Sequence, residues 1–147
     1  MHGIGIDTVH DEYIVTNPFA DTILFFRGGA NEDEAPLRLI QGPNTKIIMP
    51  DSVAVDPMHN EIFVADGAYR YLDKRDEAEQ KELGFIGVWN DTDQGDVPPM
   101  SIIKGSNSML LRPRGVAMNP QDGEIYVVDV NRNALFAFSL PEVFEIK

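Results

Sequence analysis

Three oxygen-bearing side chains stand at matching places along the chain: Asn17, Asp66 and Asp129. Each ends a run of β-branched and aromatic residues. A ring of amide and carboxylate oxygens there would supply ligands for a cation or hydrogen-bond acceptors for a bound molecule. The alternative is that each side chain caps its own turn through a local hydrogen bond to the backbone, as Asn and Asp readily do.

A second acidic group lies in the segment Asn90–Asp96. Asp91, Asp93 and Asp96 alternate with polar residues and Gly95, which is how a short loop brings several hard oxygens around Ca²⁺. The match to a calcium loop is partial, because Gly95 precedes the third Asp and Ser101 stands where a bidentate Glu would be needed. The segment therefore predicts either a calcium site or a solvated turn.

Other catalytic groups are few. Cysteine is absent, which removes disulfides, thiolate metal sites and Cys nucleophiles, and no serine stands in a Gly-x-Ser-x-Gly setting. His10 and His59 occupy equivalent turns that are too far apart to share one metal ion. We expect these two and His2 to be turn and surface residues. No cofactor is required; calcium at Asp91, Asp93 and Asp96 is the one candidate.

Charge restricts the partners. The 147 residues include 24 acidic and 12 basic side chains, for a formal net charge of −12. Nucleic acid and anionic membranes are not expected as partners, since both need clustered Lys and Arg. The first residues lack the basic and apolar regions of a signal peptide, and no stretch approaches the ~20 apolar residues of a membrane span. The compartment stays open.

An internal repeat positions these candidates. Ser52–Asp66 aligns with Gly3–Asn17 and with Gly115–Asp129. Later anchors keep the same order: Ile23–Phe26 matches Ile86–Trp89 and Leu135–Phe138, and Pro36–Gly42 matches Pro99–Gly105. Each unit predicts four short strands separated by turns, and a repeat of roughly 40–50 residues with four strands is typical of a β-propeller blade.

The fold class is therefore all-β: one propeller segment over residues 1–147 with three four-stranded blades. Their approximate bounds are residues 1–49, 50–112 and 113–147. In the third blade, Val143–Lys147 is predicted to supply the fourth strand because it alternates apolar and polar residues after a turn.

The second blade carries an insertion over residues 67–84. Asp73–Leu83 is rich in helix formers and predicts a short exposed helix. Tyr69, Arg70 and Tyr71 would be the anchoring residues if the insertion is a lid or contact element beside the central channel. The alternative is a tolerated surface insertion.

The third unit resembles the NHL repeat. Pro113–Pro120 is followed by Asp122-Gly123, a strand ending at Asp129, and an apolar strand ending in Phe138. The first two units depart at the turn, where His10-Asp11 and His59-Asn60 replace Asp-Gly. The resemblance implies a ring that most often has six blades. It also implies a binding platform or, in related superfamilies, a lactonase or lyase.

Two functions follow from these observations. The first is a non-enzymatic binding or scaffold module that presents its channel face to a protein or small molecule. The second is a metal-dependent hydrolase of the lactonase type, with Asn17, Asp66 and Asp129 holding a divalent ion beside the channel.

Assembly is the sharpest expectation. Three blades span half of a six-bladed ring and leave two blade faces open. We expect the open faces to be lined by Ile14, Ile23 and Phe25 of the first blade and by Val116, Tyr126, Leu135 and Phe138 of the third. Two chains arranged head to tail would bury both faces and form a homodimeric ring. The alternatives are a fragment of a longer chain and an open head-to-tail fibre.

Circular dichroism tests the fold class directly. We expect a spectrum dominated by β-structure, because regular strands occupy each repeat and only the insertion favours helix. A helix-dominated spectrum would contradict the propeller assignment.

Overall fold

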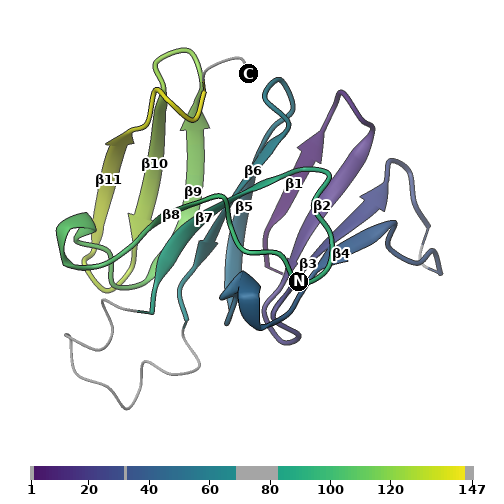
Figure 1. Ribbon diagram of the computed structural model, residues 1–147, viewed down its shortest axis with the longest axis horizontal. Coiled ribbons are helices and arrows are strands. Elements are labelled where there is room, and N and C mark those ends of the chain that lie inside the picture. The colour runs from purple at the N-terminus through teal and green to yellow at the C-terminus, as the bar shows by residue number, and fades with distance from the viewer. Residues whose placement is uncertain (1, 32, 69–82, 145–147) are drawn as a thin grey trace.

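The computed structural model describes residues 2–31, 33–68 and 83–144, and there the chain forms three separate antiparallel sheets (Figure 1). Blade 1 consists of β1 (Ile4–Asp7), β2 (Glu12–Asn17), β3 (Thr22–Arg27) and β4 (Arg38–Ile40). Blade 2 consists of β5 (Pro50–Asp56), β6 (Glu61–Asp66), β7 (Phe85–Asn90) and β8 (Ser101–Ile103). Blade 3 consists of β9 (Pro113–Asn119), β10 (Glu124–Asp129) and β11 (Ala134–Ser139). The all-β prediction is confirmed.

Helical structure in the described part of the chain is limited to two 3₁₀ turns, η1 (Pro43–Thr45) and η2 (Ser106–Ser108). No helix among these residues is long and apolar enough to cross a membrane. The predicted helix over Asp73–Leu83 lies outside the described residues except for Leu83, which is in a turn.

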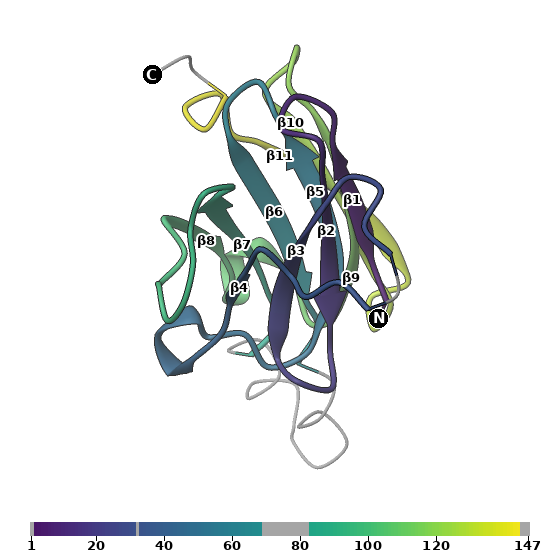
Figure 2. The same ribbon diagram turned by 90° about the vertical axis from the view of Figure 1, so that its right-hand side faces the viewer.

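Each sheet is a meander in which neighbouring strands follow one another in sequence. The first strands of the blades pack side by side, β1 against β5 and β5 against β9. Figure 2 shows β4 and β8 on the side of the molecule away from β1 and β9. The strands β1, β5 and β9 therefore take the place of the innermost strands of a propeller, which surround its central channel.

The hairpin turns explain why the first two units depart from Asp-Gly. Asp11, Asn60 and Gly123 occupy the same turn position and have φ angles of 55°, 58° and 65°. This left-handed conformation favours Gly, and among other residues Asp and Asn adopt it most readily. The three turns thus share one backbone conformation although their sequences differ.

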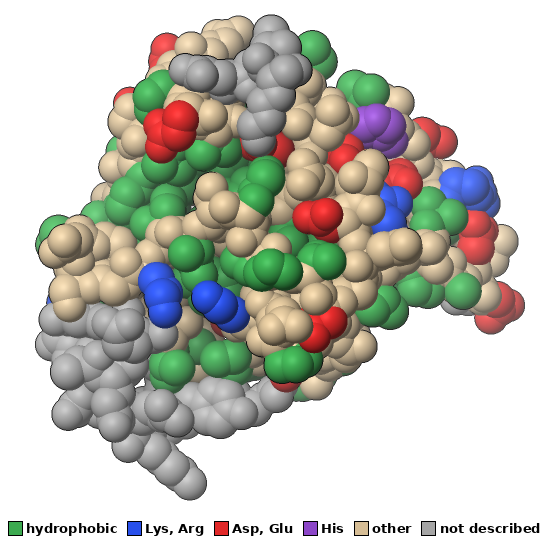
Figure 3. Space-filling view, viewed as in Figure 1, with side chains coloured by type: hydrophobic (Ala, Val, Ile, Leu, Met, Phe, Trp, Pro, Cys, Tyr) green, Lys and Arg blue, Asp and Glu red, His purple; other side chains and the backbone are tan. Residues whose placement is uncertain are grey.

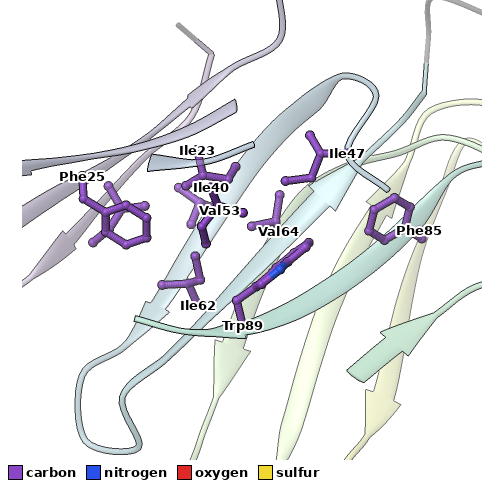
Figure 4. Packing of buried hydrophobic residues seen from close by; sticks show 10 residues of the cluster. Ile23, Phe25, Ile40, Ile47, Val53, Ile62, Val64, Phe85 and Trp89 are labelled. Carbon is purple, nitrogen blue, oxygen red and sulfur yellow. The ribbon is translucent and has the colours of Figure 1, made fainter. Parts of the chain in front are cut away.

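Blade 1 and blade 2 share an apolar core. Ile14, Ile23 and Phe25 of blade 1 are fully buried against the face of blade 2 that carries Ile62 and Trp89 (Figure 4). Alternation along the strands brings the other side chains of blade 2 to its opposite face. This alternation gives blade 2 two apolar faces.

The second face of blade 2 packs against blade 3. Phe63 and Val88 are buried together with Ile125 and Val127 of β10. Phe144, which follows β11, stacks on Phe63 with ring centroids 5.5 Å apart. Blade 2 is therefore covered on both sides.

The predicted fourth strand of blade 3 differs from the structure. Val143 and Phe144 lie in a turn, with their backbone N–H groups bonded to the carbonyls of Leu140 and Pro141. The stacking of Phe144 on Phe63 draws this segment onto blade 2 instead of along β11. Residues 145–147 are outside the described part, within which the sheet of blade 3 has three strands.

The predicted open faces also need correction. Ile14, Ile23 and Phe25 lie between the blades with no exposed surface, and Val116 and Phe138 pack against blade 2. These five side chains point to the faces between the blades, whereas Tyr126 and Leu135 lie on the open face of blade 3. Among the exposed apolar residues, Ile4 and Ile6 lie on the open face of blade 1, and Val128 and Leu135 lie on that of blade 3.

Replacing Phe25 with Ala tests the core between blades 1 and 2. Loss of a fully buried ring should lower the free energy of unfolding by about 3–5 kcal/mol, measured by urea denaturation. Phe19→Ala is the matched control, since Phe19 is 80% exposed and its loss should change stability by less than about 0.5 kcal/mol. Equal effects of the two variants would contradict this packing.

Candidate functional site

The inner strands β5 and β9 each contain a bulge near their start. The pairing register of β5 shifts between Pro50 and Ser52, and that of β9 shifts between Pro113 and Gly115. Asp51 and Arg114 are the residues left without a strand partner. A bulge re-aims the side chain that it releases from the ladder, and these two side chains meet between the blades.

Asp51 links all three blades. Its Oδ1 atom lies 2.9 Å from Nδ1 of His2 and 3.1 Å from a guanidinium nitrogen of Arg114. His2, Asp51 and Arg114 stand at the same place in the three repeats. The Asp51 side chain is 3% exposed, whereas those of His2 and Arg114 are 40% and 36% exposed. A buried carboxylate thus holds two accessible cationic or hydrogen-bonding groups; we call this the bulge triad.

The second oxygen of Asp51 faces the start of the insertion. Oδ2 is buried and accepts no hydrogen bond from the described residues. A Cβ atom placed on Gly67 would lie 3.0 Å from it. The bulge triad therefore lies at the end of the blades from which the insertion leaves, as do Asp66 and Asp129. It can hold a polar ligand through charge and hydrogen bonds.

Asp66 and Asp129 bind backbone groups. Asp66 accepts hydrogen bonds from the N–H groups of Ile48, Met49 and Ala68. Asp129 accepts from four N–H groups in the same manner: Leu111, Arg112, Asn131 and Arg132. Each carboxylate joins its own turn to the segment that leads into its blade. Both carboxylates therefore cap their own turns, and they also bind the backbone of the preceding segment.

Burial raises the pKa of the Asp66 carboxyl to about 6. Hydrogen bonds from the backbone N–H groups of Ile48, Met49 and Ala68 oppose this rise. The charge of nearby Asp51 contributes to the rise. The carboxylate of Asp66 therefore belongs to the same electrostatic environment as the bulge triad.

The other predicted ligand positions differ from Asp66 and Asp129. Asn17 is half-buried, whereas Asp66 and Asp129 have no exposed surface. Tyr69, Arg70 and Tyr71 lie outside the described part of the chain. The ring of oxygen ligands at Asn17, Asp66 and Asp129 stays a prediction.

The three carboxylates of the predicted calcium loop point to different partners. Asp93 caps the backbone N–H of Asn90 at 3.0 Å. Asp96 accepts from the backbone and side-chain amides of Asn44 at 2.7 and 2.9 Å. Asp91 is buried and lies beside His10. Among the described residues, the group of possible metal ligands that gathers within 4.8 Å is Asp7, His10 and Asp91.

This loop also connects two blades. Gly95 exchanges backbone hydrogen bonds with Leu39 and Gln41 at 2.7 and 3.0 Å, forming a parallel bridge at Ile40 on the edge of β4. Gly95 has a φ of 76°, which an L-residue adopts only with strain. The loop of blade 2 is thus hydrogen-bonded to the outer strand of blade 1.

The comparisons with known proteins agree with this architecture. A family model described as the NHL repeat matches residues 110–138, the β9–β11 region with its preceding turn. The crystal structure of the WD40 β-propeller domain of Doa1 superposes with a TM-score of 0.60 at 9% sequence identity, covering 93% of this chain. The chain is similar to NHL-like β-propellers. No curated protein matches it.

The chain spans 36% of the length of the Doa1 structure. A likeness at this identity establishes the propeller fold and leaves the ligand open. In the described part of the propeller segment the sheets do not close into a ring.

The bulge triad was missed by sequence reasoning. A signal was present, because His2, Asp51 and Arg114 occupy one repeat position and carry complementary charges. Equivalent positions in successive inner strands converge toward the propeller axis, so opposite charges there can meet. The bulges that turn the side chains toward one another are not visible in the sequence.

Asp129→Ala tests the role of the turn carboxylates. The variant leaves four backbone N–H groups without their acceptor, and we expect a loss of about 2–5 kcal/mol in the free energy of unfolding. Asn17→Ala at the equivalent position should cost less than about 1 kcal/mol. Chemical denaturation measures both. Similar small losses would show that the Asp129 contacts do not stabilise the fold.

Proposed function

We propose that this chain is a non-enzymatic binding or scaffold module that completes a six-bladed propeller by self-association. The observation that carries the proposal is that its two open blade faces are repeat equivalents of the two faces buried between blades 1 and 2. The exposed face of blade 1 matches one side of that buried contact, and the exposed face of blade 3 matches the other.

On blade 1, Ile4 and Ile6 are 64% and 58% exposed. Their equivalents in blade 2 are Val53 and Val55, which belong to the core shared with blade 1. The exposed isoleucines therefore occupy positions that the repeat uses for contact with a preceding blade. Exposed apolar residues grouped on one face are typical of an interface.

On blade 3, Leu135 is 66% exposed, whereas its equivalent in blade 1, Ile23, has no exposed surface. Tyr126, which is half-buried, likewise corresponds to the fully buried Ile14. This face therefore matches the one that the repeat uses for contact with a following blade.

The two faces are complementary in type, so blade 3 of one chain would pack on blade 1 of a second chain. Two such contacts related by a two-fold axis close a ring of six blades. Each contact would have the character of a standard protein interface of ~1,600 Å². A longer chain supplying the missing blades, and an open fibre, are the other ways to cover these faces.

The bulge triad supports a binding function for the assembled ring. His2 and Arg114 present accessible donors at the inner strands, held by the buried Asp51. Such a preorganised polar group suits a small molecule or peptide that carries an acidic group on the channel face.

The rival function is a metal-dependent hydrolase with Asn17, Asp66 and Asp129 as ligands. It would require Asp66 and Asp129 to bind a metal ion in addition to the backbone N–H groups that they already accept. This requirement favours the binding module. Stoichiometric metal at the channel together with lactone hydrolysis that chelation abolishes would favour the hydrolase.

Sedimentation velocity of the 147-residue chain tests the assembly. We expect a dimer at micromolar concentration, and a monomer for Ile6→Lys and for Leu135→Lys, because each places a charge in the contact. Met58→Lys is the control: Met58 is 77% exposed but lies in the β5–β6 turn, away from both faces. A monomeric wild-type chain would contradict self-association, and unlimited growth would contradict ring closure.

A further inference from the structure

At the opposite end of the blades from the bulge triad, the β1–β2 turn of blade 1 presents a histidine and an aspartate together. Asp7 Oδ1 accepts the backbone N–H groups of Val9 and His10, both at 2.9 Å. This arrangement fixes the carboxylate and directs Oδ2 at Nδ1 of His10, 2.8 Å away. Hydrogen bonds to one oxygen of a carboxylate commonly orient the other oxygen toward a metal ion.

Asp91 of blade 2 approaches the same histidine. Its Oδ2 lies 3.3 Å from Nδ1 of His10, while its Oδ1 is buried with no hydrogen-bond partner in the described part of the chain. The Asp91 side chain is 3% exposed. A buried carboxylate oxygen without a hydrogen-bond donor is costly. The Asp91 carboxylate lies beside His10 and Asp7, where a cation could offset this cost.

The nearest arginine is already paired with another carboxylate. Arg38 forms a bidentate ion pair with Glu12 at 2.8 and 2.7 Å, and it donates to the backbone carbonyl of Asp91 rather than to its carboxylate. Glu12 and Arg38 offset each other. Asp7 and Asp91 therefore leave two negative charges beside His10 when its imidazole is neutral.

Blade 2 contains the same turn without the third ligand. Asp56 accepts from the N–H groups of Met58 and His59, and its Oδ2 lies 2.6 Å from Nδ1 of His59. In place of Asp91, blade 2 has Phe144 beside His59, with ring centroids 6.1 Å apart and an angle of 75° between the rings. The two turns form an internal comparison in which one has a second carboxylate and the other has an apolar ring.

We propose that Asp7, His10 and Asp91 form a site for Zn²⁺ or a similar divalent transition-metal ion that joins blade 1 to blade 2. One imidazole nitrogen and two carboxylate oxygens match the ligand preference of zinc better than the all-oxygen preference of Ca²⁺ or Mg²⁺. Ligand atoms on a tetrahedral zinc ion with bonds of ~2.0 Å stand about 3.3 Å apart. The observed separations of 2.8 and 3.3 Å from Nδ1 need only a small adjustment.

A surface pocket lined by His10, Glu12, Arg38, Asp91 and Thr92 adjoins the site. It leaves room for water or a ligand group at the remaining coordination position, as in zinc sites with three protein ligands. On the face seen in Figure 3, a histidine side chain is exposed beside acidic and basic ones.

Protons compete with the metal ion for the same atom. The hydrogen bond to Asp7 raises the pKa of His10, and burial raises the pKa of Asp91, opposed by the charge of His10. A metal ion binds Nδ1 only when this nitrogen carries no proton, so affinity for the ion should fall as the pH is lowered. Glu12 and Arg38 are the other charged groups facing the pair.

Calorimetric titration of the full chain with Zn²⁺ at neutral pH tests the site. We expect one ion per chain, and with Co²⁺ the visible absorption of a low-coordinate nitrogen–oxygen site. His10→Ala and Asp91→Asn should each weaken Zn²⁺ binding by more than about tenfold, whereas His59→Ala should leave it unchanged.

Metal-free thermal unfolding separates ligation from a purely structural role. Asp91→Asn removes a buried negative charge while keeping its shape, so the metal-free melting temperature should stay equal or rise, and the increase that Zn²⁺ gives the wild-type chain should disappear. Absence of Zn²⁺ binding by the wild-type chain, binding that survives both His10→Ala and Asp91→Asn, or preference for Ca²⁺ at this site would overturn the proposal.

Discussion

Burial of both faces of each four-stranded sheet is the constraint on which this structure depends. Alternating side chains place apolar residues on both sides of a strand, so a blade is stable only when a neighbour covers each side. Blade 2 meets this requirement, because Trp89 is buried toward blade 1 and Phe63 toward blade 3. Within the chain, the outer blades meet it on one side only.

Carboxylates hold this arrangement together at the points where the chain passes between blades. Asp66 and Asp129 bind the backbone that leads into blades 2 and 3. Asp51 joins the three blades through His2 and Arg114, and Asp91 brings blade 2 to His10 of blade 1. Acidic residues therefore form contacts between blades, in addition to those that lie at the surface.

The blades could be predicted from the sequence because the repeat preserves strand length, turn position and apolar spacing. The sequence does not show which face of a blade is buried, because a strand that is apolar on both sides gives no indication of which side meets a neighbour. Ile14 and Phe25 were predicted on an open face, and they are buried between the blades. The calcium interpretation brings Asp91, Asp93 and Asp96 to one ion and stays a prediction, while in the structure their carboxylates contact His10, Asn90 and Asn44. Those contacts cross between blades or depend on local backbone geometry, and spacing along the chain does not reveal them.

An engineered disulfide tests the central claim, that blade 3 of one chain covers blade 1 of another. Within the chain, a Cβ on Gly5 would lie 2.5 Å from Cγ2 of Val55 across the blade contact; the repeat equivalents of this pair on the open faces are Ala117 and Ile6. The natural chain has no cysteine, so Ile6→Cys combined with Ala117→Cys gives an unambiguous reporter. Under mild oxidation we predict a covalent dimer carrying two intermolecular disulfides and no larger species. Failure to cross-link, or a bond between two copies of position 6, would contradict the account.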